Sequence, residues 1–316
     1  MAVENVTSFA VLNYDGLLYT KSNKRTPILN SIGAPKYTDH VEFPVSLEYS
    51  LGNAAQPAIS ETASLTAPDA SRFTRTQAKN VCQIFHRAIT ISYAKMSNMG
   101  TMSGINIARD VPNPANEKDF QIARQMEAIA NDIEYTFTKG VYNLANSDAT
   151  INKSKGLMNA ISTNVVEYST STGWTKANLI SLFKSIYDNG GNVDDCILLL
   201  SSADKIKLTG MYEGQTGYLM PTSRTIGGAN IIELVTDFGN VDVVMSPHLS
   251  AGEVLCYNPR VCAPVEMNVP GKGNFFYEEL AKTGAAEKGQ IFGQIGLDFG
   301  PEWFHGKLVA LSPKAA

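Results

Sequence analysis

The segment between residues 41 and 93 most constrains what this chain can fold into. Large apolar side chains alternate with polar or small ones over Val41–Tyr49, and the alternation returns over Arg75–Tyr93 with a slip near Ile84. A period of two is typical of a strand with one buried face. The stretch between the two runs is rich in Ala, Ser, Thr and Pro. The pattern predicts two strands joined by a long tip that a compact domain cannot bury.

A long helix is predicted after this hairpin. Asn113 is suited to cap it and Pro114 to occupy its first position. Apolar side chains then recur at three- and four-residue spacing, namely Ile122, Met126, Ile129, Ile133, Phe137 and Val141. Gly140 is suited to end this helix, but the apolar stripe runs on to Leu144. We therefore expect the helix to cover about residues 115–144.

The second half of the chain mixes short helices and strands. The expected elements are a helix capped by Thr175 and ended by Gly190-Gly191, a buried strand Cys196–Leu200, a helix from Ser201 or Ser202 through Met211, a hairpin of Asn230–Val235 and Val241–Met245, a strand Val254–Tyr257, and closing strands over 289–299 and 304–311. Strand and helix do not alternate throughout, which excludes a doubly wound parallel sheet. We predict an α+β fold.

Composition and charge exclude several classes of protein. The 316 residues are 44% hydrophobic and 18% charged, so the chain is able to build a sizeable core. The net charge of −4 and the absence of any Lys/Arg run argue against a protein that wraps nucleic acid. No apolar run approaches 18 residues and no signal peptide begins the chain, so we expect no membrane contact. The spacing of the four cysteines predicts buried free thiols.

No motif with catalytic chemistry is present. The four histidines, His40, His86, His248 and His305, lack metal-ligand spacing, and no Gly-x-Ser-x-Gly elbow occurs. Gly271-Lys272 lacks the rest of a phosphate-binding loop. The acid pairs Asp194-Asp195 and Glu278-Glu279 are adjacent, which on a strand points them to opposite faces. We expect no enzyme and no catalytic, cofactor-binding or metal-binding residue, with an active site scattered along the chain as the alternative.

Several segments, taken in order, resemble one family of tailed-phage major head proteins. They are Asn80-Val-Cys-Gln-Ile-Phe85 with Ile89-Thr-Ile-Ser92, Glu127 to Gly140 with Asn131-Asp-Ile-Glu134, Lys155-Gly-Leu-Met-Asn-Ala-Ile161, Thr236-Asp-Phe-Gly239 with Val243-Val244, and Glu279-Leu-Ala-Lys282-Thr-Gly284. Each motif is short. Their order over about residues 40–311 is what identifies the chain as similar to this family.

The resemblance implies the Hong Kong 97-type capsid fold. The chain would then divide into an N-terminal arm (1–40), an extended loop (41–92), a peripheral domain with the spine helix (93–154), an axial domain (155–260) and a return to the peripheral domain (261–316). The implied function is self-assembly into hexamers and pentamers of an icosahedral shell. That shell would enclose double-stranded DNA without sequence-specific binding.

The resemblance also implies how the subunits meet. Arm and extended loop would lie on neighbouring copies, and the expected contact residues are Phe43, Val45, Leu47, Ile59, Leu65 and Phe73. Some relatives cross-link through a loop lysine, but Phe43 to Gln77 contains none, so assembly should be non-covalent. The chain lacks a long charged helical extension at its start, which favours a separate scaffolding protein, and a portal is a further expected partner. We expect synthesis in the host bacterial cytoplasm and a final place in the virion.

Two other structural functions stay open at this point. A cellular encapsulin-like compartment would share the fold and hold cargo protein instead of DNA. Another virion component, such as a tail tube subunit, would form tubes or rings.

Overall fold

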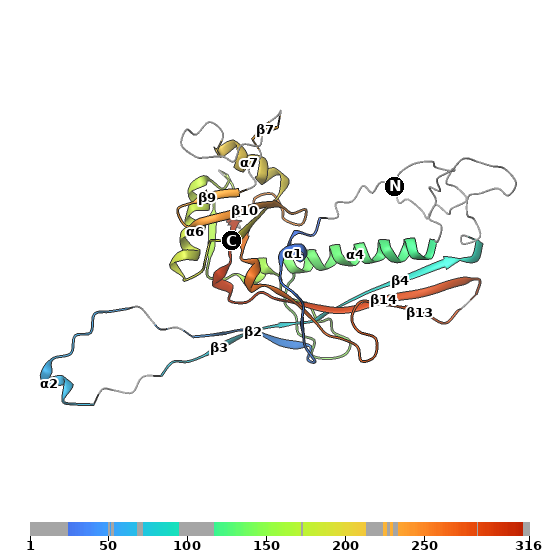
Figure 1. Cartoon of the computed structure of the whole chain (residues 1–316), viewed down its shortest axis with the longest axis horizontal. Helices are drawn as coiled ribbons and strands as arrows, with labels where there is room; N and C mark the ends of the chain where they lie inside the picture. The colour runs from blue at the N-terminus through green and yellow to red at the C-terminus, as the bar shows by residue number, and fades with distance from the viewer. Residues whose placement is uncertain are drawn as a thin grey trace, which may run out of the picture.

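The structure is a computed structural model of the chain. It describes residues 25–49, 51, 54–67, 72–94, 117–171, 173–212, 224–225, 228–229, 233–282 and 284–311. The molecule is elongated, with a hairpin projecting from one end of a two-lobed body (Figure 1). Most of the predicted arm, residues 1–24, lies outside the described residues.

The first lobe is built on a five-stranded sheet around β14 (Ala286–Asp298). On one side β14 pairs with β4 (Gln83–Ser92), antiparallel. On the other side it pairs with β13 (Phe276–Glu279) and β12 (Ala263–Glu266), and β1 (Lys36–Tyr37) pairs with β12. We call this sheet and the helix that covers it the peripheral lobe.

The predicted long helix is α4 (Glu117–Lys139), and it lies along one face of β4 and β14 (Figure 1). Ile129, Ile133 and Phe137 are four residues apart and are buried against this sheet, as their spacing predicts. The positions proposed for its cap, Asn113 and Pro114, lie outside the described residues.

The predicted extension of this helix to Leu144 is wrong. A Cβ on Gly140 would collide with the carbonyl oxygens of Ser154 and Thr136, so two backbone segments meet at a position that only glycine fits. The chain turns there, and the backbone N–H of Gly156 donates to the carbonyl of Gly140 (2.9 Å). Leu144 is exposed on the loop that follows.

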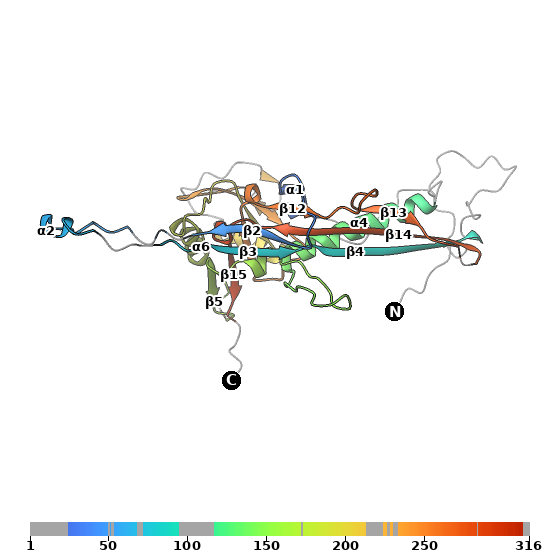
Figure 2. The ribbon, with the colours of Figure 1, turned by 90° about the horizontal axis from the view of Figure 1, so that it is seen from below.

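The predicted hairpin consists of β2 (Glu42–Glu48) and β3 (Thr76–Val81), with the one-turn helix α2 (Glu61–Ser64) at its tip. The second predicted strand is divided at Cys82: β3 pairs in the hairpin and β4 pairs in the peripheral sheet. Val81 and Cys82 are consecutive and both buried, which interrupts the alternation. Figure 2 shows the hairpin continuing in line with β4 and β14.

The second lobe, which we call the axial lobe, holds a six-stranded sheet. Its order is β5 (Val165–Tyr168), β15 (Gly306–Ala310), β11 (Val254–Tyr257), β6 (Cys196–Leu200), β10 (Gly239–Met245) and β9 (Glu233–Thr236). The continuous apolar run of β6 is buried, as predicted. The part of the expected first hairpin strand over residues 230–232 lies outside the described residues.

Helices α6 (Lys176–Asp188) and α7 (Ser202–Tyr212) belong to the axial lobe. Thr175 caps α6 in a reciprocal capping box with Asn178, and Ser201 accepts a hydrogen bond from the Asp204 N–H at the start of α7. Both caps confirm the sequence prediction. Short elements complete the chain: α1 (Pro27–Ser31), α5 (Leu157–Ala160), β7 (Arg224–Thr225), β8 (Gly228–Ala229), η2 (Pro259–Val261) and η3 (Glu302–Phe304).

All four cysteines are buried free thiols, as predicted. Burial raises the pKa of Cys82 to about 12, so this thiol stays protonated. None of the described helices is long and apolar enough to cross a membrane. The expected domain boundaries near residues 40, 92, 154 and 260 stay predictions.

Candidate assembly surface

The tip of the hairpin makes no hydrogen bond to the body of the subunit in the parts of residues 49–75 that the structure describes. Its own order comes from α2, where Ser60 accepts a hydrogen bond from the Ala63 N–H (3.1 Å). The other described residues of the tip are irregular backbone that projects away from both lobes (Figures 1 and 2). Beyond α2, these residues form no secondary structure of their own.

Four of the six expected contact residues are exposed on this hairpin. The exposed fractions are 61% for Leu47, 71% for Ile59, 85% for Leu65 and 63% for Phe73. Tyr49 and Leu51 are exposed in the same way. The sequence interpretation missed these two as contact residues, although Tyr49 continues the alternation of β2 and could have been found from it. Large apolar side chains gathered on one projecting segment indicate a surface that a partner covers.

The other two expected contact residues lie inside the subunit. Phe43 is 4% exposed and packs with Cys82 and Val265. Its ring lies 2.7 Å from where a Cβ on Gly296 would stand, so the glycine makes room for it. Val45 is half-buried against the same cluster. Phe43 therefore anchors the base of the hairpin to β14, and its side chain is not available to a neighbour.

Asn80 is a second anchor at the base of the hairpin, and it is fully buried. Its Nδ2 donates to the carbonyls of Lys155 (3.1 Å) and Leu297 (2.7 Å). Its Oδ1 accepts from the backbone N–H groups of Val81 (2.9 Å) and Lys155 (2.8 Å). One side chain thus joins β3, β14 and the segment after α4. Asn80 belongs to one of the family motifs in the sequence, but nothing in the sequence around it indicates this role.

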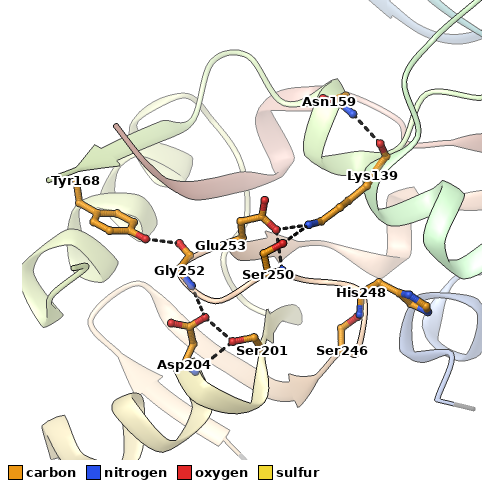
Figure 3. A network of polar contacts seen from close by, with 10 residues as sticks. All are labelled: Lys139, Asn159, Tyr168, Ser201, Asp204, Ser246, His248, Ser250, Gly252 and Glu253. Atoms are coloured by element: carbon orange, nitrogen blue, oxygen red, sulfur yellow. Dashed lines mark hydrogen bonds and ion pairs between the residues drawn. The ribbon is translucent and has the colours of Figure 1, made fainter. Parts of the chain in front are cut away.

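The two lobes are joined by a polar network at the end of α4 (Figure 3). Lys139 forms an ion pair with Glu253 (2.5 Å) and donates to Ser250 (2.8 Å). His248 pairs with Asn131 of α4 (3.0 Å). Burial, followed by the nearby Lys139 charge, lowers the pKa of His248. The turn between β10 and β11 is therefore bonded to the spine helix.

The same turn is bonded to the axial lobe. The Gly252 N–H donates to Asp204 (2.8 Å), and the Tyr168 hydroxyl donates to the Gly252 carbonyl (2.7 Å; Figure 3). Asp204 also accepts from Ser201 (2.6 Å) and from the Trp174 indole (2.7 Å). These contacts fix the orientation of the axial sheet against α4.

A buried carboxylate joins α1 to α4. Glu134 accepts hydrogen bonds from the backbone N–H groups of Ile28 (2.9 Å) and Leu29 (3.0 Å), while the Ser31 hydroxyl pairs with the Tyr257 hydroxyl (2.6 Å). Burial raises the pKa of Glu134 to about 7, and the two N–H donors oppose that rise. Ile28 and Leu29 of the predicted arm are thereby held on the spine helix.

The acid pairs noted in the sequence do not converge on a shared site. Each acid has its own contact: Asp194 with the Asn240 N–H, Asp195 with Arg260, Glu278 with Lys272 and Glu279 with Lys118. Among the described residues, no group of three or more His, Cys, Asp or Glu is arranged to hold a metal ion.

A two-lobed α+β subunit with a projecting apolar hairpin and a long helix along its peripheral sheet belongs to the class of shell-forming capsid proteins. Residues 2–312 match the family model described as "SU10 major capsid protein". The chain belongs to this family and is a phage shell protein, whose place is the virion. No sequence among the curated proteins matches it.

Solved structures agree on the fold. A chain from the "Capsid of native GTA particle" is similar with a TM-score of 0.62 at 10% identity, covering 98% of this chain and 99% of that one. A chain of Microbacterium phage Oxtober96 gives 0.59 at 10% identity, with 95% and 96% covered. The SrpI encapsulin of Synechococcus elongatus PCC 7942 gives 0.58 at 10% identity, with 96% and 95% covered. The expected Hong Kong 97-like capsid fold is confirmed.

Proposed function

We propose that the subunit assembles non-covalently and that the hairpin tip, residues 49–75, lies on a neighbouring copy in the shell. The observation that carries this proposal is the exposure of Ile59, Leu65 and Phe73 on a tip that makes no hydrogen bond to the body of the subunit among its described residues, with Leu47 exposed on the paired strand at its base. Burying one such side chain contributes about 1.5–3 kcal/mol. Contact with a neighbouring subunit would bury these side chains and gain this free energy, whereas the isolated subunit leaves them exposed.

The absence of lysine from Phe43 to Gln77 supports contacts in place of covalent cross-links. Each contact is modest, but a closed symmetric shell repeats it at every subunit. Hexamers and pentamers are the arrangement that such repetition produces in an icosahedral shell. The arm contributes in the same way, with its residues Ile28 and Leu29 held by Glu134 of the same subunit.

Membership of a capsid family supports further proposals about contents, partners and origin. We propose that the shell encloses double-stranded DNA, that a separate scaffolding protein and a portal take part in assembly, and that the subunit is made in the host cytoplasm. The net charge of −4 supports a shell that encloses DNA without gripping it.

Deleting residues 54–72 tests the proposal most directly. We expect soluble subunits that form few closed shells in negative-stain electron microscopy. A finer test changes Ile59, Leu65 and Phe73 together to Ser, and its matched control changes the exposed polar Gln56, Thr66 and Thr74 of the same tip to Ser. The control should assemble at the wild-type yield, and the same yield from the apolar triple variant would refute the role of the tip.

The encapsulin likeness supports a second candidate, a compartment that holds protein cargo. Its TM-score is close to those of the GTA and phage capsid chains, so the fold does not separate the two functions, and the family match favours the phage shell. Particles purified from the natural source should contain nuclease-protected DNA; particles filled with one enzyme would favour the compartment. Tubes or rings in the same images would favour a tail tube subunit.

A further inference from the structure

Within the described part of the chain, β4 has a strand partner on one side only. It pairs with β14 in the register Ser92 to Ala286, and the Tyr93 N–H donates to the Ala285 carbonyl (3.1 Å), which continues that register. Hydrogen-bonded residue pairs alternate along an antiparallel ladder. The odd-numbered residues of β4 therefore direct their backbone polar groups to β14, and the even-numbered residues direct theirs away from it.

The far side of β14 agrees with this assignment. The Met267 N–H donates to the Gln294 carbonyl (3.2 Å), and the Leu280 N–H donates to the Lys288 carbonyl (2.9 Å). The backbone groups of even-numbered β14 residues thus bond to β12 and β13, and those of odd-numbered β14 residues bond to β4.

Among the described residues, the outer edge of β4 has no strand partner. No described residue bonds to the outward backbone groups of Ile84, His86, Ala88 and Thr90, and their side chains are exposed. Proteins usually protect such edges with proline, lysine or a bulge. The segment from Ile84 to Thr90 has no proline and no lysine, and its pairing with β14 has no register shift. Its one charged side chain, Arg87, is paired with Asp132 of the same subunit. It is a regular template for another strand.

We propose that this edge pairs antiparallel with the β4 edge of a second copy, about a two-fold axis that sets Ala88 opposite Ala88. The inference rests on the proposed self-assembly and adds one specific contact to it. An antiparallel pair of identical strands is self-complementary, as a two-fold interface requires.

Charge disfavours one neighbouring register, and the size of Ala88 favours the proposed one. Centring the pair on Arg87 would set two guanidinium groups directly opposite each other, which is destabilising. Centring it on Ala88 places Arg87 opposite Ile89 and His86 opposite Thr90, so no like charges face. Arg87 keeps its ion pair with Asp132 of its own α4 (2.5 Å). The small Ala88 side chain permits close approach at the axis.

Disulfide trapping in assembled particles tests the contact. In this register the two Ala88 Cα atoms stand about 5.5 Å apart, within disulfide range. Ala88→Cys should give a covalent dimer, twice the 34.2 kDa chain, as the main band on a non-reducing gel after mild oxidation. The native thiols are buried and should give no background.

Single and double variants at the next pair provide matched controls. His86→Cys alone and Thr90→Cys alone should not cross-link, because identical positions then lie roughly 14–15 Å apart. The double variant His86→Cys/Thr90→Cys should cross-link, because position 86 of one copy faces position 90 of the other. This variant still tests the register if Ala88→Cys does not assemble.

Three results would overturn the inference. They are no dimer from any variant in intact particles, a dimer from Thr90→Cys alone, or a dimer from Ala88→Cys/Phe73→Cys without one from Ala88→Cys. The last would assign the edge to the neighbour's hairpin tip. In each case intact particles by microscopy would leave the proposed shell function standing, whereas absence of particles from the wild-type chain would refute that function itself.

Discussion

Replacing Asn80 by Ala should loosen the base of the hairpin. The Asn80 side chain makes four hydrogen bonds with backbone groups of Val81, Lys155 and Leu297, and it is fully buried. Alanine supplies neither the donor nor the acceptor. The carbonyls of Lys155 and Leu297 and the N–H groups of Val81 and Lys155 would each lose a partner in a site closed to water.

The expected loss is about 3–5 kcal/mol. An unpaired buried polar group costs about 1–3 kcal/mol, and partial relaxation or an entering water keeps the sum below four full penalties. Asn143→Ala is the matched control, because Asn143 is exposed and its Nδ2 donates to one carbonyl, that of Ile151 (2.5 Å). That change should cost under about 1 kcal/mol.

Urea unfolding of the unassembled subunit, followed by circular dichroism, measures both values. Shell yield by sedimentation gives the functional readout, since a loosened hairpin base should lower the yield of the Asn80 variant alone. An unfolding free energy of Asn80→Ala within about 0.5 kcal/mol of the control would refute the clamp role assigned to this side chain.

Two further predictions concern positions in and at the end of α4. The folded-state pKa of Glu134, about 7, lies above its ordinary 4.5, so its contribution to stability is fully present below about pH 4.5 and is lost as the pH rises through about 7. Glu134→Gln should remove that slope from urea midpoints measured over this range, and parallel slopes for the two proteins would contradict the assignment. Gly140→Ala should cost at least about 1–3 kcal/mol, because its Cβ would meet the backbone oxygens of Ser154 and Thr136. Gly210→Ala inside α7 meets nothing within 4 Å and should be neutral or stabilising by about 0.5–1 kcal/mol, so equal melting temperatures for the two alanine variants would count against this packing argument.

The local elements were predictable because their signals are local. The cap at Thr175, the apolar run of β6 and the stripe of α4 each depend on residues within a few positions of one another. The residue at which α4 ends was not predictable, because it depends on the contact of Gly140 with Ser154, which belongs to a different segment. The apolar stripe beyond Gly140 has the right period but no surface to pack against.

The anchoring side chains could not be found from the sequence for the same reason. Asn80 bonds to residues 75 and 217 positions away, and Glu134 bonds to a backbone 106 positions away. A polar residue inside an apolar alternation predicts an exposed position. These two are buried because distant backbone groups satisfy them, and no periodicity records that. The exposed tip was found, because a long small-residue segment with isolated large apolar side chains has no way to bury itself.

One irregularity in β2 explains why Phe43 and Leu47, both expected as contact residues, lie in different environments. A strand without interruption would place Phe43, Val45 and Leu47 on one face, so all three side chains would be buried or all three exposed. The register with β3 shifts between Pro44 and Ser46, where Val45 is the extra residue. A bulge of this kind exchanges the faces on which the following side chains lie. Phe43 before the bulge enters the subunit's own core, whereas Leu47 and Tyr49 after it turn outward. The same run of apolar residues therefore anchors the hairpin at its base and presents apolar surface toward its tip, and the bulge at Val45 is the point of division.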